Sequence, residues 1–288
     1  MTWLEVRREL ATELGSDAEA RWLIEEVFDR HPDATSEHRL FELRALVDRR
    51  LAGVPLQYVI GHWSFRTLDL VVDPRVLIPR PETEQVVEVA LAELRRSARD
   101  RPDPVLVDLG TGSGAVALSL AVEGQAAFPR LQVWATDADE DALAVAALNR
   151  VRVGAGDPRA AERVVLRRGS WWHSLPASLQ GALDLVVCNP PYVGEGEWAE
   201  LDAEVRLEPY RALVARDGLG GIPGMAEVEA VLAGAPDWLA PAGALVVEIA
   251  PHQSAAAIAA ARRAGLRSPR VERDLAARER VLVAESPR

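Results

Sequence analysis

A glycine-rich loop follows an apolar run near the middle of the chain. The run VLVDL is followed by Gly110, Thr111, Gly112, Ser113 and Gly114, and then by an apolar segment that predicts a helix. Glycine lets the backbone turn sharply out of a strand and approach a ligand closely, and the helix that follows presents free N–H groups. The spacing G-x-G-x-G differs from the dinucleotide fingerprint G-x-G-x-x-G, which disfavours a nicotinamide cofactor. A tight turn with a purely structural role is the alternative.

A carboxylate stands at the end of the next apolar run. Asp137 closes the run VWATD. An acid at the tip of the second strand suits the two neighbouring hydroxyls of a ribose, because a carboxylate can accept both hydrogen bonds. Asp139 could do the same or could cap the following helix, and we favour Asp137. With the glycine loop, this acid predicts a ligand that contains adenosine, bound at the carboxyl ends of the strands.

The third motif is Asn189, Pro190, Pro191 and Tyr192, directly after the apolar run LDLVVC. Two prolines end a strand and fix the backbone, and a residue before proline is pushed to extended geometry. The side-chain oxygen of Asn189 and the carbonyl of Pro190 can then face one planar NH₂ group. The ring of Tyr192 offers a surface on which a flat amide or base can stack. This motif indicates a site that orients a planar nitrogen.

The composition excludes several kinds of chemistry. Of the 288 residues 33 are basic, and all of these are arginine. Without lysine the chain can form neither a lysine Schiff base nor a P-loop. The 44 acidic residues give a net charge of −11, which is unsuited to binding a nucleic-acid backbone. We therefore expect no direct contact with nucleic acid.

Metals, disulfides and membranes are not expected either. Cys188 is the only cysteine, and the five histidines have no metal-ligand spacing. The start MTWLEVRREL is charged, unlike a signal peptide, and no apolar run approaches the roughly 20 residues of a membrane span. We expect a cytoplasmic protein without bound metal.

Strand and helix patterns alternate from residue 104 onward. Runs rich in Val and Leu without clean alternation are typical of strands buried on both faces, and helical crossovers impose parallel pairing. The predicted fold class is α/β, with a doubly wound seven-stranded sheet. Strands are expected at 105–109, 131–136, 164–167, 183–188, 244–249, 269–273 and 281–284. Helices are expected at 115–122, 140–151, 225–239 and 254–264.

The chain before this region predicts a small helical bundle and a linker. Ser16 and Glu19 form a capping-box signature for a helix that ends near His31 and Pro32. The bundle could be a packing appendage or a docking surface for the substrate. The next segment predicts a β-hairpin, and a helix follows from Pro81 towards residue 99. The expected units are a helical bundle at 1–53, a linker with the hairpin at 54–80 and the main domain at 81–288.

Together the three motifs resemble S-adenosylmethionine-dependent methyltransferases that methylate planar nitrogen. More closely, the chain resembles the HemK-type protein-(glutamine-N(5)) methyltransferases, which modify peptide-chain release factors. Further stretches that support this likeness are PLQYVIG at 55–61, LIPRPETE at 77–84 and VEI at 247–249. The likeness extends from about residue 54 to the end of the chain.

The resemblance implies methyl transfer from S-adenosylmethionine to the side-chain amide nitrogen of a glutamine, with S-adenosylhomocysteine as product. The substrate it implies is the Gly-Gly-Gln motif of class I release factors, in translation termination. It places the cofactor contacts at Gly110, Thr111, Gly112, Ser113, Gly114, Asp137, Trp171 and Asn189. It places the substrate contacts at Asn189, Pro190, Pro191 and Tyr192, of which Asn189, Pro190 and Tyr192 are catalytic. Either Trp171 or Trp172 could lie near the adenine. The likeness also favours a position of Glu82 and Glu84 at the cofactor cleft.

Three other interpretations remain open. A glutamine methyltransferase acting on a ribosomal protein would use identical chemistry. An adenine-amino methyltransferase acting on nucleic acid would use the same tetrad, but it normally needs a basic groove and a way to extrude the base. A cofactor-binding module without catalysis would not need an intact tetrad from Asn189 to Tyr192.

Overall fold

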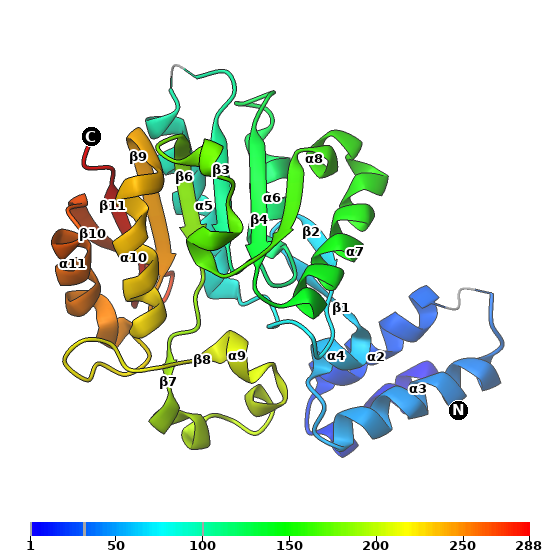
Figure 1. Ribbon diagram of the computed structural model, residues 1–288. Helices are drawn as coiled ribbons and strands as arrows, with labels where there is room; N and C mark the ends of the chain where they lie inside the picture. The colour runs from blue at the N-terminus through cyan, green and yellow to red at the C-terminus, as the bar shows by residue number, and fades with distance from the viewer. Residues whose placement is uncertain (1, 31–32, 100) are drawn as a thin grey trace.

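A seven-stranded sheet forms the centre of the molecule (Figure 1). The computed structural model describes residues 2–30, 33–99 and 101–288. Within these ranges the strands lie in the order β10-β11-β9-β6-β3-β4-β5. They are β3 Val105–Leu109, β4 Gln132–Asp137, β5 Val164–Arg168, β6 Leu183–Cys188, β9 Leu239–Glu248, β10 Arg267–Arg273 and β11 Glu279–Glu285. Every strand that the sequence predicts is present.

The sheet is mixed. Strands β9, β6, β3, β4 and β5 pair in parallel, as expected for strands joined by helical crossovers. Strand β11 is antiparallel to both β9 and β10, because β10 and β11 follow one another with only a turn between them. The chain order reverses at β3, which has β4 on one side and β6 on the other. In such sheets ligands bind outside the carboxyl ends of the strands at the point of reversal.

Helices cover both faces of this sheet. Leu106 and Leu185 belong to the apolar core on the side of α5 and α6, whereas their neighbours Val107 and Val186 belong to the core on the side of α10 and α11. Figure 1 shows α10 in front of the sheet and α5 behind it. The strands are therefore buried on both faces, which explains their uninterrupted apolar runs. The covering helices are α5 Pro81–Ser97, α6 Ala115–Gly124, α7 Glu140–Gly156, α10 Ala226–Trp238 and α11 Ser254–Arg263.

The N-terminal helices have an apolar core of their own. Val47 and Leu56 are both buried in it, so the bundle continues past the expected boundary at residue 53. The helices are α1 Trp3–Leu14, α2 Asp17–Arg30, α3 Ser36–Leu51 and α4 Leu56–Ile60. The predicted helix end near His31 and Pro32 lies outside the described residues.

The expected β-hairpin is confirmed, but it belongs to the sheet domain. Phe65 and Leu70 are buried in the core shared with α5 and α6. The side chain of Asn149 in α7 binds the backbone of Val71, accepting from its N–H at 2.6 Å and donating to its C=O at 3.0 Å. The expected linker at 54–80 is thus divided between the bundle and the sheet domain. The strands of the hairpin are β1 His62–Phe65 and β2 Leu68–Val71.

Short elements between β6 and α10 lie below the carboxyl ends of the strands (Figure 1). Strands β7 and β8 pair in parallel there. The elements are β7 Val193–Gly194, η3 Glu195–Glu200, η4 Val205–Leu207, α9 Tyr210–Leu213 and β8 Val214–Ala215. The other short helices are α8 Pro158–Glu162, η1 Trp171–Ser174, η2 Ala177–Leu179 and η5 Pro251–Gln253.

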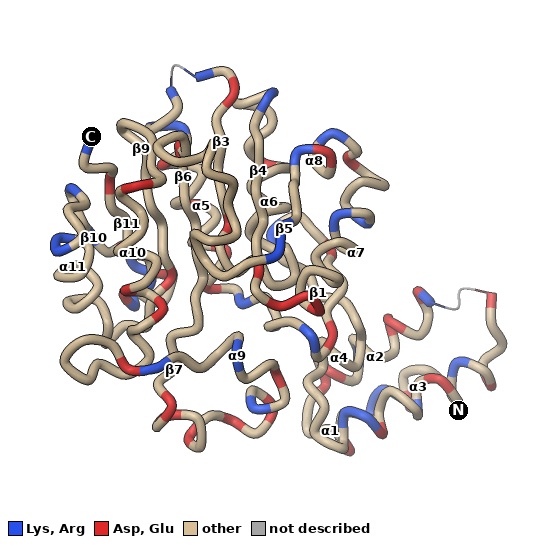
Figure 2. The backbone as a smooth tube through the Cα atoms, viewed as in Figure 1, with Lys and Arg blue, Asp and Glu red and all other residues tan. Residues whose placement is uncertain are grey.

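Charges of both signs are interspersed along the N-terminal helices (Figure 2). Many of them form ion pairs, such as that between Arg44 and Glu13 at 2.9 Å. Among the helices of the described ranges, none combines the length and the apolar character that crossing a membrane requires.

Candidate active site

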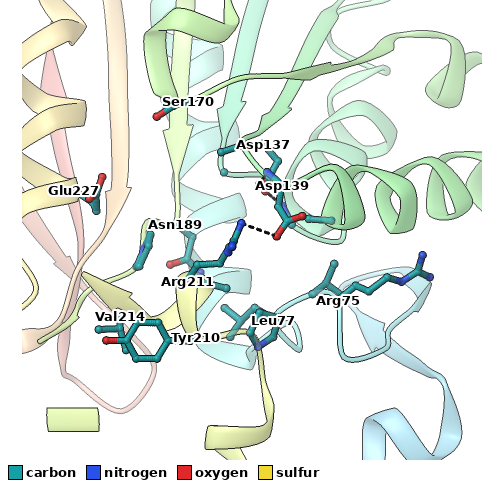
Figure 3. A pocket seen from close by; sticks show the side chains of 18 of the residues that line it. Arg75, Leu77, Asp137, Asp139, Ser170, Asn189, Tyr210, Arg211, Val214 and Glu227 are labelled. Carbon is teal, nitrogen blue, oxygen red and sulfur yellow. Dashed lines mark hydrogen bonds and ion pairs between the residues drawn. The ribbon is translucent and has the colours of Figure 1, made fainter. Parts of the chain in front are cut away.

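A cavity of about 380 Å³ lies at the carboxyl ends of β3, β4 and β6, where the chain order of the sheet reverses (Figure 3). This volume is within the usual range for small-molecule sites, about 300–1,000 Å³. Its walls come from loops that are far apart in the sequence, so the fold gathers the three predicted motifs. The lining residues are Arg75, Val76, Leu77, Gly110, Gly112, Asp137, Ala138, Asp139, Ala142, Gly169, Ser170, Trp171, Asn189, Pro191, Pro209, Tyr210, Arg211, Ala212, Val214 and Glu227.

The glycine loop contributes Gly110 and Gly112 to the cavity wall. Gly110 has a φ of 76° and Gly112 a φ of 54°, in the left-handed region that favours glycine. A Cβ atom at Gly110 would lie 3.4 Å from the ring of Trp171. The Gly110 N–H donates to the carbonyl of Thr136 at 2.9 Å, which ties the loop to β4. The loop therefore leaves its backbone close to any ligand in the cavity.

The rest of the predicted loop supports the site from outside the cavity. Thr111 and Ser113 are buried, and Gly114 is the N-cap residue of α6 with a φ of 83°. The Thr111 hydroxyl donates to Asp108 at 2.7 Å, and the Ser113 carbonyl accepts from the side chain of Asn149 at 2.8 Å. Thr111, Ser113 and Gly114 are predicted cofactor contacts, but of the loop only Gly110 and Gly112 line the cavity.

Asp108 is a structural acid that the motif analysis missed. It is buried inside β3, and its Oδ2 also accepts from the N–H of Ala117 at 3.2 Å. Burial raises the pKa of Asp108 to about 7, although both hydrogen bonds oppose the shift. The sequence could have indicated this role, because Asp108 is an acid within an otherwise apolar strand. Burying an acid costs free energy unless it is hydrogen-bonded.

Asp137 lies where the sequence analysis places it, at the end of β4 and on the cavity wall. Its Oδ2 accepts from the Gly112 N–H at 2.9 Å and its Oδ1 from the Asp139 N–H at 2.9 Å. Burial raises the pKa of Asp137 above its ordinary value, against these backbone hydrogen bonds. Because a carboxylate offers about four lone-pair positions, both oxygens retain room for a further donor.

Asp139 caps a helix and also forms an ion pair at the cavity. Its Oδ1 accepts from the N–H of Asp141 at 3.0 Å and so caps α7, as anticipated. Its Oδ2 forms an ion pair of 3.4 Å with Arg211 of α9, which points across the cavity (Figure 3). Because Asp139 is already paired with the cation Arg211, whereas Asp137 accepts only from backbone N–H groups, Asp139 is the weaker candidate for binding ribose.

Trp171 rather than Trp172 lines the cavity. The indole N–H of Trp171 donates to Glu227 of α10 at 2.7 Å, and Trp171 has an unusual positive φ of 44°. Trp172 stacks instead on Trp238, with ring centroids 6.0 Å apart. The structure thus separates the two tryptophans that the sequence left in competition.

The Asn-Pro-Pro-Tyr tetrad leaves β6 beside the cavity. Asn189 and Pro191 line it, while Pro190 is buried. Tyr192 lies outside the lining, and its hydroxyl donates to Glu248 at 3.1 Å. Burial raises the pKa of Tyr192. Besides Trp171, the cavity wall carries the aromatic side chain of Tyr210 of α9, which the sequence analysis missed.

Asn189 is held from behind by residues that the motifs do not include. Its Nδ2 donates to the Thr83 hydroxyl at 3.2 Å, and that hydroxyl donates to Glu248 Oε2 at 2.7 Å. Gln253 donates to the carbonyl of Tyr192 at 3.1 Å and so anchors the far end of the tetrad. The sequence could have indicated Glu248, because it is an acid inside an apolar strand like Asp108. Nothing in the sequence indicates Thr83 or Gln253 as part of the site.

The expectation that Glu82 and Glu84 face the cofactor cleft is wrong. Glu82 Oε1 accepts from Arg278 at 2.8 Å, and Glu84 Oε1 accepts from the N–H of Arg66 in the hairpin at 2.9 Å. Both carboxylates lie in the first turn of α5, where the helix dipole favours acids. They fix α5 against the β1–β2 hairpin and the C-terminal strands.

Glu208 holds the segment before α5 at the cavity. This buried acid accepts from the N–H of Ile78 at 2.9 Å and also forms an ion pair with Arg80. It thereby joins the cavity-lining stretch at 75–77 to the cavity-lining stretch at 209–212. Within the described ranges no cluster of three or more His, Cys, Asp or Glu side chains could hold a metal ion.

The chain is similar to a known protein family and to individual proteins of known sequence. The family model described as Methyltransferase small domain matches residues 89–206. The release factor glutamine methyltransferase of Bordetella pertussis is 41% identical over 238 residues, which are 83% of this chain and 80% of that protein. The release factor glutamine methyltransferase of Gloeobacter violaceus is 41% identical over 255 residues, 88% of this chain and 82% of that protein.

Solved structures agree on the fold. A methyltransferase from Pyrococcus furiosus has a TM-score of 0.50 at 17% identity, covering 84% of this chain and 95% of that chain. The N-terminal domain of human METTL16 in complex with SAH has a TM-score of 0.51 at 15% identity, covering 77% of this chain and 76% of that chain. At these identities the likeness establishes a methyltransferase fold.

Proposed function

Since the chain belongs to the family of release factor glutamine methyltransferases, we propose that it methylates the glutamine of the Gly-Gly-Gln motif in class I peptide-chain release factors. The methyl donor is S-adenosylmethionine, and the acceptor is the side-chain amide nitrogen. The observation that carries this proposal is that Asn189 lines the same cavity as Asp137 and the glycine loop. Release factors act on ribosomes, so the enzyme is expected in the cytoplasm.

The residues of the cavity fit S-adenosylmethionine. Asp137 has free acceptor positions for two ribose hydroxyls, and the backbone of Gly110 and Gly112 allows close approach. Trp171 supplies an aromatic surface on the same wall. When bound, this cofactor supplies a methyl group activated by a sulfonium. Thr111, Ser113 and Gly114 contribute by fixing the loop from behind.

Asn189 and Pro190 bind the glutamine amide in this proposal. An amide nitrogen is a poor nucleophile because its lone pair is delocalised into the carbonyl. The side-chain oxygen of Asn189 and the carbonyl of Pro190 accept its two hydrogens and favour a pyramidal nitrogen. These hydrogen bonds strengthen as positive charge develops on the nitrogen, so they stabilise the transition state more than the ground state.

Orientation supplies much of the remaining acceleration. Well-placed groups can lower a barrier by roughly 7–11 kcal/mol without further chemistry. The two prolines keep the backbone of the tetrad rigid, and Pro191 borders the cavity beside Asn189. Tyr192 keeps the tetrad in place through Glu248, and Tyr210 is the ring available for stacking on the flat amide. No general base is required, since the proton can leave after transfer.

The direct test offers three substrates to the protein. Release factor, ribosomal protein and DNA are each incubated with the protein and S-adenosylmethionine, and mass spectrometry locates any added methyl group. The expected result is one methyl on the Gly-Gly-Gln glutamine of the release factor. A release factor whose motif glutamine is replaced by glutamate is the matched control and should stay unmodified.

Each other outcome has a definite meaning. Methyl found only on adenine would replace the proposal with an amino methyltransferase of nucleic acid. Methyl found only on a ribosomal-protein glutamine would keep the chemistry and change the substrate. Binding of S-adenosylmethionine without transfer to any of the three would indicate a binding module.

A further inference from the structure

A continuous chain of hydrogen bonds runs behind the Asn-Pro-Pro-Tyr tetrad. Asn189 Nδ2 lies 3.2 Å from Thr83 Oγ1, which lies 2.7 Å from Glu248 Oε2, and Tyr192 Oη lies 3.1 Å from Glu248 Oε1. Thr83 is 4% exposed and Glu248 is 1% exposed, so water does not compete for these contacts. The chain connects the end of β6, the first turn of α5 and the end of β9.

With Glu248 ionised, the chemistry of these groups fixes the direction of every hydrogen bond. An ionised carboxylate can only accept, so the hydroxyls of Thr83 and Tyr192 both donate to Glu248. A hydroxyl has a single hydrogen, so Thr83 Oγ1 can only accept from Asn189. The group that Asn189 turns towards Thr83 must therefore be its NH₂. Its oxygen Oδ1 therefore lies at the opposite corner of the planar amide group.

We propose that Glu248, acting through Thr83, is the positioning residue that sets the orientation of the Asn189 amide and keeps Oδ1 free to accept a hydrogen from the substrate amide. This inference rests on the proposed function of the tetrad. The two ends of an asparagine amide have nearly the same shape, so packing alone cannot choose between them. A flipped Asn189 would present hydrogens to a substrate NH₂ and could not bind it.

Burial raises the pKa of Glu248 above its ordinary value, and the groups around it act in both directions. Arg280 favours its charge, whereas burial and the nearby Glu82 disfavour it. Thr83 and Tyr192 also favour the charged form, because both donate to it. A glutamine at position 248 would keep the shape of Glu248 but add an NH₂ donor. Thr83 would then be free to donate to Asn189 and to reverse its amide.

Three variants separate orientation from simple stability. T83V keeps the shape of Thr83 without a hydroxyl, T83S keeps the hydroxyl, and E248Q keeps the shape of Glu248 while reversing one hydrogen bond. We expect T83V and E248Q to lower kcat on the release factor by at least about 10-fold. T83S should stay within about 3-fold of the wild type, and all three should bind S-adenosylmethionine within about 3-fold of its affinity.

A second readout does not depend on activity. The chain contains two asparagines, Asn149 and Asn189, so ¹⁵N-asparagine labelling gives two side-chain NH₂ groups in an NMR spectrum. Asn149 is an internal control, because its NH₂ donates to the carbonyls of Val71 and Ser113. The N189A variant assigns the signals. We expect T83V and E248Q to shift the NH₂ signals of Asn189 alone, and T83S to leave them nearly unchanged.

The outcomes that would overturn the inference are separate from those of the proposed function. Unshifted Asn189 signals in T83V refute the hydrogen bond, whatever the substrate of the wild type is. A shift accompanied by wild-type kcat in both T83V and E248Q refutes the positioning role. If E248Q fails to fold, the comparison of T83V with T83S decides, and equal losses in these two would also refute it.

Discussion

Three carboxylates order the backbone of the site, of which Asp108 and Glu248 are buried and Asp137 is half-buried at the cavity wall. Asp108 holds the glycine loop, Asp137 ties that loop to the end of β4, and Glu248 anchors the tetrad. Each accepts two hydrogen bonds within the protein, and burial raises the pKa of each. Removing a carboxylate from water lowers the stability of the fold, and hydrogen bonds to its oxygens reduce that cost. The same hydrogen bonds fix the geometry of the site.

The preference for Asp137 over Asp139 as the ribose-binding acid leads to a first prediction. D137N replaces one acceptor oxygen with a donor that opposes a backbone N–H, so we expect it to weaken S-adenosylmethionine binding by roughly 10–100-fold. D139A should change the affinity by less than about 3-fold but lower the free energy of unfolding by about 0.5–2 kcal/mol, because it removes the cap of α7. Calorimetric titration and urea unfolding measure both effects. The reverse order of affinities would assign the ribose to Asp139.

The raised pKa of Asp108 makes a second prediction about pH. Between the ordinary value of 3.8 and about 7, the folded state holds a proton that the unfolded state has lost. The contribution of Asp108 to stability therefore decreases as pH rises, by at most about 1.4 kcal/mol per pH unit. D108N keeps an oxygen for Thr111 and Ala117 but does not titrate, so the difference in unfolding free energy between D108N and wild type should change in favour of D108N from pH 5 to pH 7. Urea unfolding at several pH values tests this, and a difference independent of pH would contradict it.

At the scale of elements, the turn from β3 into α6 is tightly constrained. Gly114 has a φ of 83°, and a Cβ there would lie 3.1 Å from the side chain of Leu118 in α6. Gly15 has a comparable φ of 70° but open space around its Cβ position. We expect G15A to cost about 1 kcal/mol of stability and G114A about 2–4 kcal/mol, since G114A adds crowding to the backbone strain. Equal losses in thermal unfolding would show that crowding at the turn is unimportant.

The elements were predictable where their signals are local. Strands β3 and β6 have the predicted bounds, because each is an uninterrupted apolar run that ends at a turn motif. Strand β9 begins at Leu239, five residues before the predicted 244, because its first half contains Pro241 and Gly243, residue types that are typical of turns. The antiparallel position of β11 depends on pairing with β9, which periodicity does not encode.

The site was predictable only in part, because some of its residues carry a local sequence signal and others are brought together only by the fold. Asp137, Asn189 and the glycines could be predicted as site residues because each follows an apolar run in the sequence. The contacts of Asn189 with Thr83 and of Thr83 with Glu248 span 106 and 165 residues, and only the folded sheet brings them together. Tyr210, Arg211 and Glu227 reach the cavity from elements that carry no motif.

At the scale of the whole molecule, His62 connects the helical bundle to the sheet domain. It lies 2.8 Å from Glu26 of α2 and 2.6 Å from Asp69 of β2, and Asp69 in turn pairs with Arg152 of α7. Burial lowers the pKa of His62, but the hydrogen bonds to Glu26 and Asp69 outweigh it and raise the pKa overall. This connection positions the bundle beside the cavity-bearing edge of the sheet.

The sign of this shift gives a prediction for the bundle. The stabilisation by charged His62 is fully present below its ordinary pKa of about 6.5 and is lost as pH rises through the raised value. H62Q should therefore increase hydrogen exchange in α2 more at pH 6 than at pH 9, relative to wild type. Peptide-resolved hydrogen exchange measures this difference. An equal effect at both pH values would assign His62 a packing role alone.

The central claim is that the Asn189 side chain holds the glutamine amide next to the activated methyl group. The most direct measurement is kcat of N189A on the release factor together with its affinity for S-adenosylmethionine. Loss of one transition-state hydrogen bond predicts a decrease in kcat of ~10²-fold or more, with the affinity within about 3-fold of wild type. Turnover near the wild-type level in a folded N189A protein that still binds the cofactor would contradict the account.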